Sequence, residues 1–139
     1  ETARAHRHSM AAIRFMVEGD GVTTTVDGKD CPMEYGDLVL TPDWCWHGHR
    51  HEGTREAMWL DVLDVPLHNY LGTARFQPPP MIEVPPTTDD TVYSVPNILP
   101  EAHVGRRDHS PRFRYPYVDV VRALSGAPRS PDRARGSST

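Results

Sequence analysis

The first half of the sequence predicts an all-β fold, a small barrel or sandwich. Three observations support this prediction. The apolar residues come in short runs rich in β-branched and aromatic side chains, Gly, Asp or Pro ends each run, and no stretch before Pro66 shows helical periodicity. The expected strands are residues 13–18, 22–26, 37–41 and 57–65.

Three turns separate the expected strands. The pair Asp27-Gly28 follows the run 22–26, and a two-residue hairpin turn needs positive φ at both positions, which Asp and Gly adopt at low cost. Residues 18–21 and 35–37 contain the other two turns, each built around glycine. The Asp-Gly pair therefore predicts a hairpin whose first strand is 22–26.

The second half differs in composition, because residues 67–139 contain 11 of the 14 prolines. Proline fixes φ and removes a backbone donor, so we expect residues 71–116 to form an extended strap or linker on the surface. Apolar residues recur at helical spacing after Pro116, which predicts one short helix over residues 117–126. Residues 127–139 have no aromatic or large aliphatic side chain, and we expect them to be disordered.

Composition argues against several classes of protein. No apolar run approaches the roughly 20 residues that a membrane helix needs, and the net charge of −4 does not favour a nucleic-acid surface. Cys31 and Cys45 allow at most one disulfide, which fits a reducing compartment. We therefore expect a cytoplasmic protein without a membrane or nucleic-acid partner. Since the chain begins at Glu1 rather than Met, we also expect it to be part of a longer protein.

Three histidines give the strongest indication of function. His6 and His8 share one face of a strand, because side chains on a strand alternate with a period of two. His47 follows 39 positions after His8. Two imidazoles from one strand and a third from a neighbouring strand form a three-nitrogen site with open positions, and imidazole suits iron, zinc, copper or nickel. The alternative is that these histidines are unconnected polar groups on the surface.

The residues around these histidines resemble the two motifs of the cupin superfamily, a small β-barrel that binds a metal in its mouth. In this pattern Gly19 follows the first two histidines, and Gly36 and Pro42 precede His47. The usual cupin pattern has a glutamate four residues after the second histidine, where this chain has Ala12. The resemblance therefore implies a metal site of three histidines without a carboxylate.

A closer resemblance is to the N-terminal cupin domain of gentisate 1,2-dioxygenase and of its relatives that act on salicylate and 1-hydroxy-2-naphthoate. It extends through residue 67 and, more weakly, into residues 113–117. The runs that carry it are His6-Arg7-His8-Ser9-Met10-Ala11-Ala12-Ile13-Arg14-Phe15, Val17-Glu18-Gly19, Gly36-Asp37-Leu38-Val39-Leu40-Thr41-Pro42 and Trp59-Leu60-Asp61. These relatives are two-cupin chains, so the resemblance implies an incomplete jelly-roll-like barrel over residues 1–70. An open barrel exposes unpaired backbone, and we therefore expect a homo-oligomer.

The resemblance also implies an activity. His6, His8 and His47 would be the ligands of Fe(II), with O₂ as co-substrate, and the reaction would be ring cleavage of gentisate to maleylpyruvate. Salicylate and 1-hydroxy-2-naphthoate are alternative substrates, because they present the same carboxylate and neighbouring hydroxyl to the metal. Two other interpretations stay open: a cupin that binds a metal and a small ligand without turnover, and an inactive fragment.

Three further residues are expected to act on the substrate. Arg14 lies six positions after His8, an even offset that on a continuous strand gives both residues the same face, where the guanidinium would hold the substrate carboxylate. His49 lies two positions after His47 and would serve as acid or base beside bound oxygen or substrate. Asp61 matches a family position at the inner pocket, where it would orient a histidine or an arginine.

Each of these side chains also has a structural alternative. Arg14 would then pair with a surface carboxylate, and His49 would be a hydrogen-bonded histidine in the wall of the pocket. Two roles are also open for the tryptophans. A tryptophan near the site either stacks on an aromatic substrate or belongs to the core or an interface. The tryptophans concerned are Trp44, Trp46 and Trp59.

Overall fold

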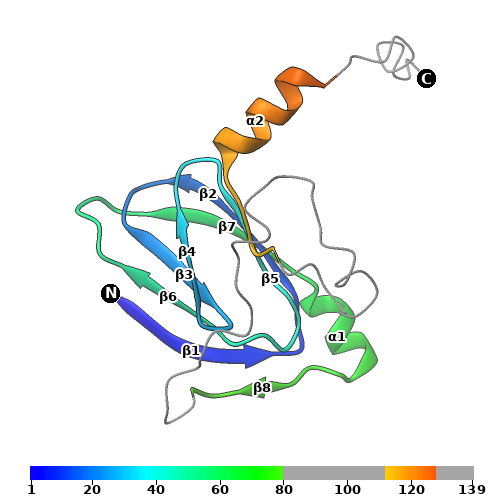
Figure 1. The fold of residues 1–139 in the computed structure, drawn as a ribbon. Helices are drawn as coiled ribbons and strands as arrows, with labels where there is room; N and C mark the ends of the chain where they lie inside the picture. The colour runs from blue at the N-terminus through cyan, green and yellow to red at the C-terminus, as the bar shows by residue number, and fades with distance from the viewer. Residues whose placement is uncertain (80–111, 128–139) are drawn as a thin grey trace.

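The computed structural model describes residues 1–79 and 112–127, which form two antiparallel sheets (Figure 1). The first sheet has the order β4 (Lys29–Met33), β3 (Val22–Val26), β6 (His47–His51), β1 (Thr2–His8) and β8 (Phe76–Gln77). The second has the order β7 (Met58–Leu63), β2 (Ala12–Glu18), β5 (Leu38–Thr41) and β9 (Arg114–Tyr115).

The expected all-β fold is confirmed. Strand β3 covers the predicted residues, and β2, β5 and β7 lie within two residues of the predicted bounds. Asp27 and Gly28 have φ values of 47° and 78°, as the hairpin turn between β3 and β4 requires. The side chains that share the space between the two sheets are Met16, Val22, Val26, Cys31, Met33, Val39, Cys45 and Phe113.

Two helices accompany the sheets, and the sequence predicts only one of them. Helix α2 (Tyr117–Gly126) covers the expected range and projects from the barrel in Figure 1. The sequence does not predict helix α1 (Val65–Leu71), because seven residues are too few to show a periodicity. Pro66 lies in the first turn of this helix, where proline is favoured. Neither of these described helices is long and apolar enough to span a bilayer.

Parts of the expected strap pair with the sheets. Strand β8 pairs with β1 and β9 pairs with β5, and Phe113 is buried in the core with 2% of its surface exposed. Edge strands offer unpaired backbone groups, which explains why these short segments attach there. Residues 80–111 of the strap and 128–139 of the tail lie outside the described residues. The boundaries 1–70, 71–116, 117–126 and 127–139 therefore stay a prediction.

Asp37 attaches the C-terminal segment to the barrel. Its carboxylate accepts hydrogen bonds from Nε and Nη2 of Arg114 at 3.0 and 2.7 Å and from the backbone N–H of Tyr117 at 2.9 Å. Only 2% of Asp37 is exposed. A buried carboxylate is tolerated when such partners replace its hydration.

We expect Asp37→Asn to destabilise the folded chain by about 2 kcal/mol, because the amide keeps the shape but loses the charge-assisted bonds to Arg114. Chemical denaturation followed by tryptophan fluorescence measures the change. Asp30→Asn is the matched control, since the ion pair between Asp30 and Arg50 is exposed and should matter by less than about 1 kcal/mol. Equal losses in the two variants would contradict the anchoring role of Asp37.

Candidate metal centre

The structure brings His6, His8 and His47 together. β1 carries the first two, and β1 pairs with β6 so that His6 is the register partner of His47. One ring nitrogen of each histidine lies within 4.8 Å of those of the other two. The ring centroid of His47 lies 4.6 Å from that of His6 and 4.6 Å from that of His8. His8 and His47 are buried, which shields the cluster from water.

A main-chain carbonyl orients each imidazole. The Nδ1 atoms of His6, His8 and His47 lie 3.0, 2.8 and 3.0 Å from the carbonyl oxygen of a residue two positions away in the sequence. A carbonyl oxygen accepts and never donates, so each Nδ1 carries the proton. Each Nε2 consequently has its lone pair available for a metal.

The environment of His47 fits a metal ligand. Its Nε2 atom is buried and has no hydrogen-bond partner among the described residues. A buried polar atom without a partner lowers the stability of the fold by roughly 1–3 kcal/mol. Burial lowers the pKa of His47 to about 3 and also lowers the pKa of His8. Both imidazoles are therefore neutral at pH 7, as metal ligation requires.

Arg14 faces the interior of the barrel, although the sequence argument that placed it there is wrong in one step. That argument assumed one continuous strand, whereas β1 ends at His8 and β2 begins at Ala12 in the other sheet. Ala12, Arg14 and Met16 form the buried face of β2, and 3% of Arg14 is exposed. After burial itself, the positive charge of Arg14 is among the causes that lower the pKa of His47.

Asp61 pairs with Arg14. The two residues are register partners in the pairing of β2 with β7, and Oδ1 of Asp61 lies 3.2 Å from Nε of Arg14. Nη1 of Arg14 donates a hydrogen bond to the hydroxyl of Thr41. Of the two partners expected for Asp61, the structure shows the arginine. A guanidinium has five N–H groups, so these contacts leave donors for an anion.

His49 lies beside the cluster on β6. Its ring centroid lies 6.1 Å from that of His47 and 5.7 Å from that of Trp59. Its Nδ1 atom shares a hydrogen bond of 3.0 Å with the hydroxyl of Thr24. Burial lowers the pKa of His49 to about 4, so this imidazole is neutral at pH 7 and offers its Nε2 atom to a ligand.

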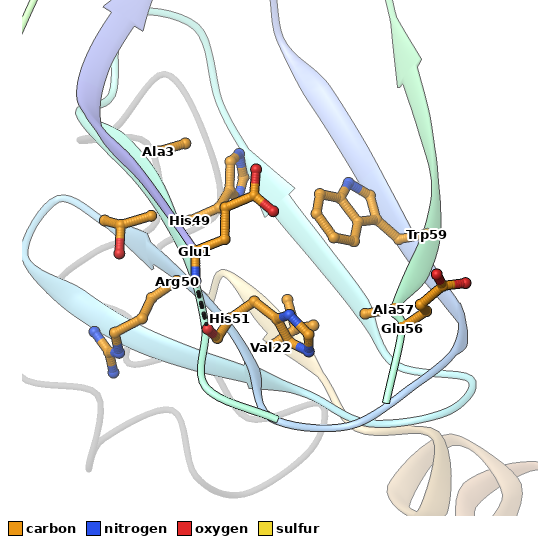
Figure 2. Close-up of a pocket in the computed structure, with 10 residues that line it drawn as sticks. Glu1, Ala3, Val22, His49, Arg50, His51, Glu56, Ala57 and Trp59 are labelled. Carbon is orange, nitrogen blue, oxygen red and sulfur yellow. Dashed lines mark hydrogen bonds between the residues drawn. The ribbon is translucent and has the colours of Figure 1, made fainter. Parts of the chain in front are cut away.

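A cavity of about 460 Å³ lies next to His49 (Figure 2). Side chains from β3, β6 and β7 and from the residue before β7 contribute to its wall. They include Val22, His49, His51, Ala57 and Trp59. His51, for which the sequence predicts no role, also lines the cavity, and its Nε2 atom is buried and has no hydrogen-bond partner among the described residues. Its even offset from His49 on one strand is the pattern that would have found it.

The three tryptophans occupy two different places. Trp59 lines the cavity beside His49. The rings of Trp44 and Trp46 instead stack over the guanidinium of Arg7, with 4.7 Å between Cζ and each ring centroid. Of the three residues considered as aromatic walls, Trp59 is the one in contact with the cavity.

Comparisons with known proteins agree with this architecture. The model of the cupin domain family matches residues 1–63. A gentisate 1,2-dioxygenase of Ralstonia sp. is 42% identical over 125 residues, which cover 89% of this chain and 35% of that protein. A 5-aminosalicylate 1,2-dioxygenase of Comamonas sp. is 41% identical over 135 residues, which cover 94% of this chain and 36% of that protein.

A solved structure of salicylate 1,2-dioxygenase from Pseudoaminobacter salicylatoxidans, described as an adduct with gentisate, gives a TM-score of 0.74 at 34% identity. The match covers 90% of this chain and 36% of that one. The chain thus spans about a third of the length of these relatives. With the two antiparallel sheets and the cluster of three histidines, residues 1–63 thus belong to the cupin domain family, and the chain as a whole is similar to gentisate 1,2-dioxygenase and its relatives.

Proposed function

We propose that the chain is part of an Fe(II)-dependent dioxygenase that cleaves the ring of a hydroxylated aromatic acid, with gentisate, converted to maleylpyruvate, as the first candidate. The observation that supports this most is the buried guanidinium of Arg14 in the same interior as His6, His8 and His47. Metal storage requires the histidines alone. Asp61 contacts only the Nε edge of this buried cation, and the guanidinium N–H groups that remain favour a second anion, which an aromatic carboxylate would supply.

One group of residues would bind the metal and a second group would bind the substrate. His6, His8 and His47 would hold Fe(II) through their Nε2 atoms, and bound Fe(II) supplies the redox chemistry that combines O₂ with the aromatic ring. Arg14 would bind the substrate carboxylate through two parallel N–H groups. Asp61 would keep the guanidinium in place, because it contacts Nε and leaves for the substrate the Nη N–H groups that Thr41 does not engage.

His49 would contact the substrate hydroxyl or oxygen beside the metal. The hydroxyl of Thr24 engages Nδ1, so Nε2 is the atom that accepts or returns a proton. Trp59, with its ring 5.7 Å from His49, would cover the face of the aromatic substrate and exclude water. Salicylate stays the second candidate substrate, because a salicylate 1,2-dioxygenase is among the structural neighbours.

We further propose a cytoplasmic homo-oligomer. The sequence contains only two cysteines, Cys31 and Cys45, both buried, and this low usage supports a reducing compartment. The outer face of β2 and β7 exposes large apolar side chains that are 40–60% accessible: Ile13, Phe15, Val17, Met58, Leu60 and Val62. Apolar faces of this extent are usually covered by another part of the protein or by another chain.

Oxygen consumption by the anaerobically Fe(II)-loaded chain tests the proposed activity. We expect uptake when gentisate is added, with a ring-opened product detected by its absorbance, and no uptake in His47→Ala. Salicylate and 1-hydroxy-2-naphthoate are run in parallel, and uptake with one of them instead would change the substrate. Full iron occupancy without uptake for any of the three would contradict catalysis by this chain and favour a binding cupin or an inactive fragment.

A further inference from the structure

Arg7 lies between two of the candidate metal ligands in the sequence, but its side chain contacts a different set of residues. Its guanidinium stacks over the rings of Trp44 and Trp46, and its Nε donates a hydrogen bond of 2.7 Å to Oε1 of Gln77. We propose that Arg7 is a positioning residue, which holds the turn before β6 and thereby fixes the orientation of His47. This inference rests on the metal site proposed above.

The turn formed by residues 42–46 is attached to the barrel on both sides of its centre. Trp44 has a φ of 59°, which is uncommon for a bulky residue and persists where neighbouring contacts hold it. Its backbone N–H donates to the carbonyl oxygen of His8 at 2.8 Å. The N–H of Trp46 donates to Oδ1 of Asp27 at 2.8 Å, and the N–H of Asp27 donates to the carbonyl oxygen of Trp46 at 2.7 Å.

Cys45 of this turn orients the third ligand. Cys45 lies between the two tryptophans, and its carbonyl oxygen accepts the hydrogen bond from Nδ1 of His47 at 3.0 Å. Because Arg7 contacts the residues on both sides of Cys45, its loss would let the turn relax and rotate this carbonyl. His6 and His8 use carbonyl groups outside the turn, so their orientation would be kept.

The chemistry of the contact requires arginine. A planar, weakly hydrated guanidinium stacks on aromatic rings, whereas the compact, strongly hydrated ammonium of lysine does not. Arg7→Lys therefore retains the charge and loses most of the stacking. Arg7→Met retains an unbranched apolar stem and loses the cation and the bond to Gln77. We expect the effect of Arg7→Lys to lie between those of the wild type and Arg7→Met.

The first test needs no metal. In ¹⁵N NMR spectra of the metal-free 139-residue chain, we expect Arg7→Met to speed exchange of the His47 Nδ1–H with water by roughly tenfold or more, while the His8 Nδ1–H is unchanged. Arg50→Met is the matched control, because Arg50 forms ion pairs with Asp30 and Glu52 away from the turn. Unchanged His47 exchange in Arg7→Met would overturn the proposal. If Arg7→Met does not fold, the same comparison is made with Arg7→Lys.

The second test measures the consequence for the metal site. We expect Arg7→Met to raise the dissociation constant for Co(II) roughly tenfold to a hundredfold and to change the visible absorption of the bound ion. A purely structural role would lower resistance to denaturant and leave both the dissociation constant and the spectrum of the folded protein unchanged, which would overturn the proposal. If the wild type binds no Co(II), the proposed metal site is wrong, and the NMR comparison still decides whether Arg7 positions His47.

Discussion

Replacing His47 with alanine is expected to abolish metal binding by the folded chain. The substitution removes the most buried of the three imidazoles and leaves the two nitrogens of β1 without the ligand from β6. Two neutral nitrogens without a carboxylate hold Fe(II) weakly, since catalytic zinc sites and non-haem iron sites use three protein ligands. Anaerobic loading with Fe(II), desalting and an iron assay should find background iron in the variant and stoichiometric iron in the wild type.

The control for this experiment is His68→Ala. His68 lies on α1, where it contacts Asp64 and Thr73, and it is not one of the three clustered histidines. We expect His68→Ala to bind iron like the wild type. Circular dichroism establishes that His47→Ala is folded, because the loss of iron has meaning only for the native barrel. Full iron occupancy in folded His47→Ala would refute the assignment of His47 as a ligand.

Replacing Arg14 with methionine is expected to weaken substrate binding a hundredfold or more and to leave the iron content nearly unchanged. The guanidinium is buried and lies in the same interior as the histidines, so its bonds to a carboxylate would be shielded from water. Truncating one partner of such a buried pair costs roughly 2–5 kcal/mol. Michaelis kinetics of oxygen uptake, with the iron content measured on the same samples, separates the two effects.

Arg14→Lys refines the prediction. Lysine keeps the charge and cannot form the two parallel N–H bonds, so we expect an intermediate KM. A KM equal to that of the wild type in Arg14→Met would show that the carboxylate binds elsewhere. Loss of iron in Arg14→Met would instead show that the arginine acts on the metal site.

Local chemistry explains what the sequence predicts well. The hairpin at Asp27-Gly28 follows from the φ values that two neighbouring residues must adopt, and the shared face of His6 and His8 follows from the period of a strand. The cluster of these histidines with His47 needs one further piece of information, the pairing of β1 with β6. The family resemblance supplied this information, which spacing alone does not contain.

Contacts between distant segments explain the rest. Arg14 reaches the interior from the second sheet because the chain bends between β1 and β2, and its partner Asp61 is set by the register with β7. The stacking of Trp44 on Arg7 and the role of Asp37 as an anchor depend in the same way on residues far apart in the sequence. Such pairings have no local pattern in the chain.

The hydrogen bonds of the three imidazoles to carbonyl groups determine which substitutions the site tolerates without reorienting the histidines. The acceptors of these three hydrogen bonds are main-chain oxygen atoms of Arg4, Met10 and Cys45. A substitution at one of these residues changes its side chain and leaves the accepting oxygen in place. The side chains proposed to face the substrate, such as Arg14 and Trp59, are separate from those acceptors. If the proposed function holds, we expect substitutions of these side chains to change which aromatic acid binds and to leave the orientation of the three imidazoles unchanged. A library randomised at the cavity wall should accordingly yield many variants that still bind iron and differ in substrate.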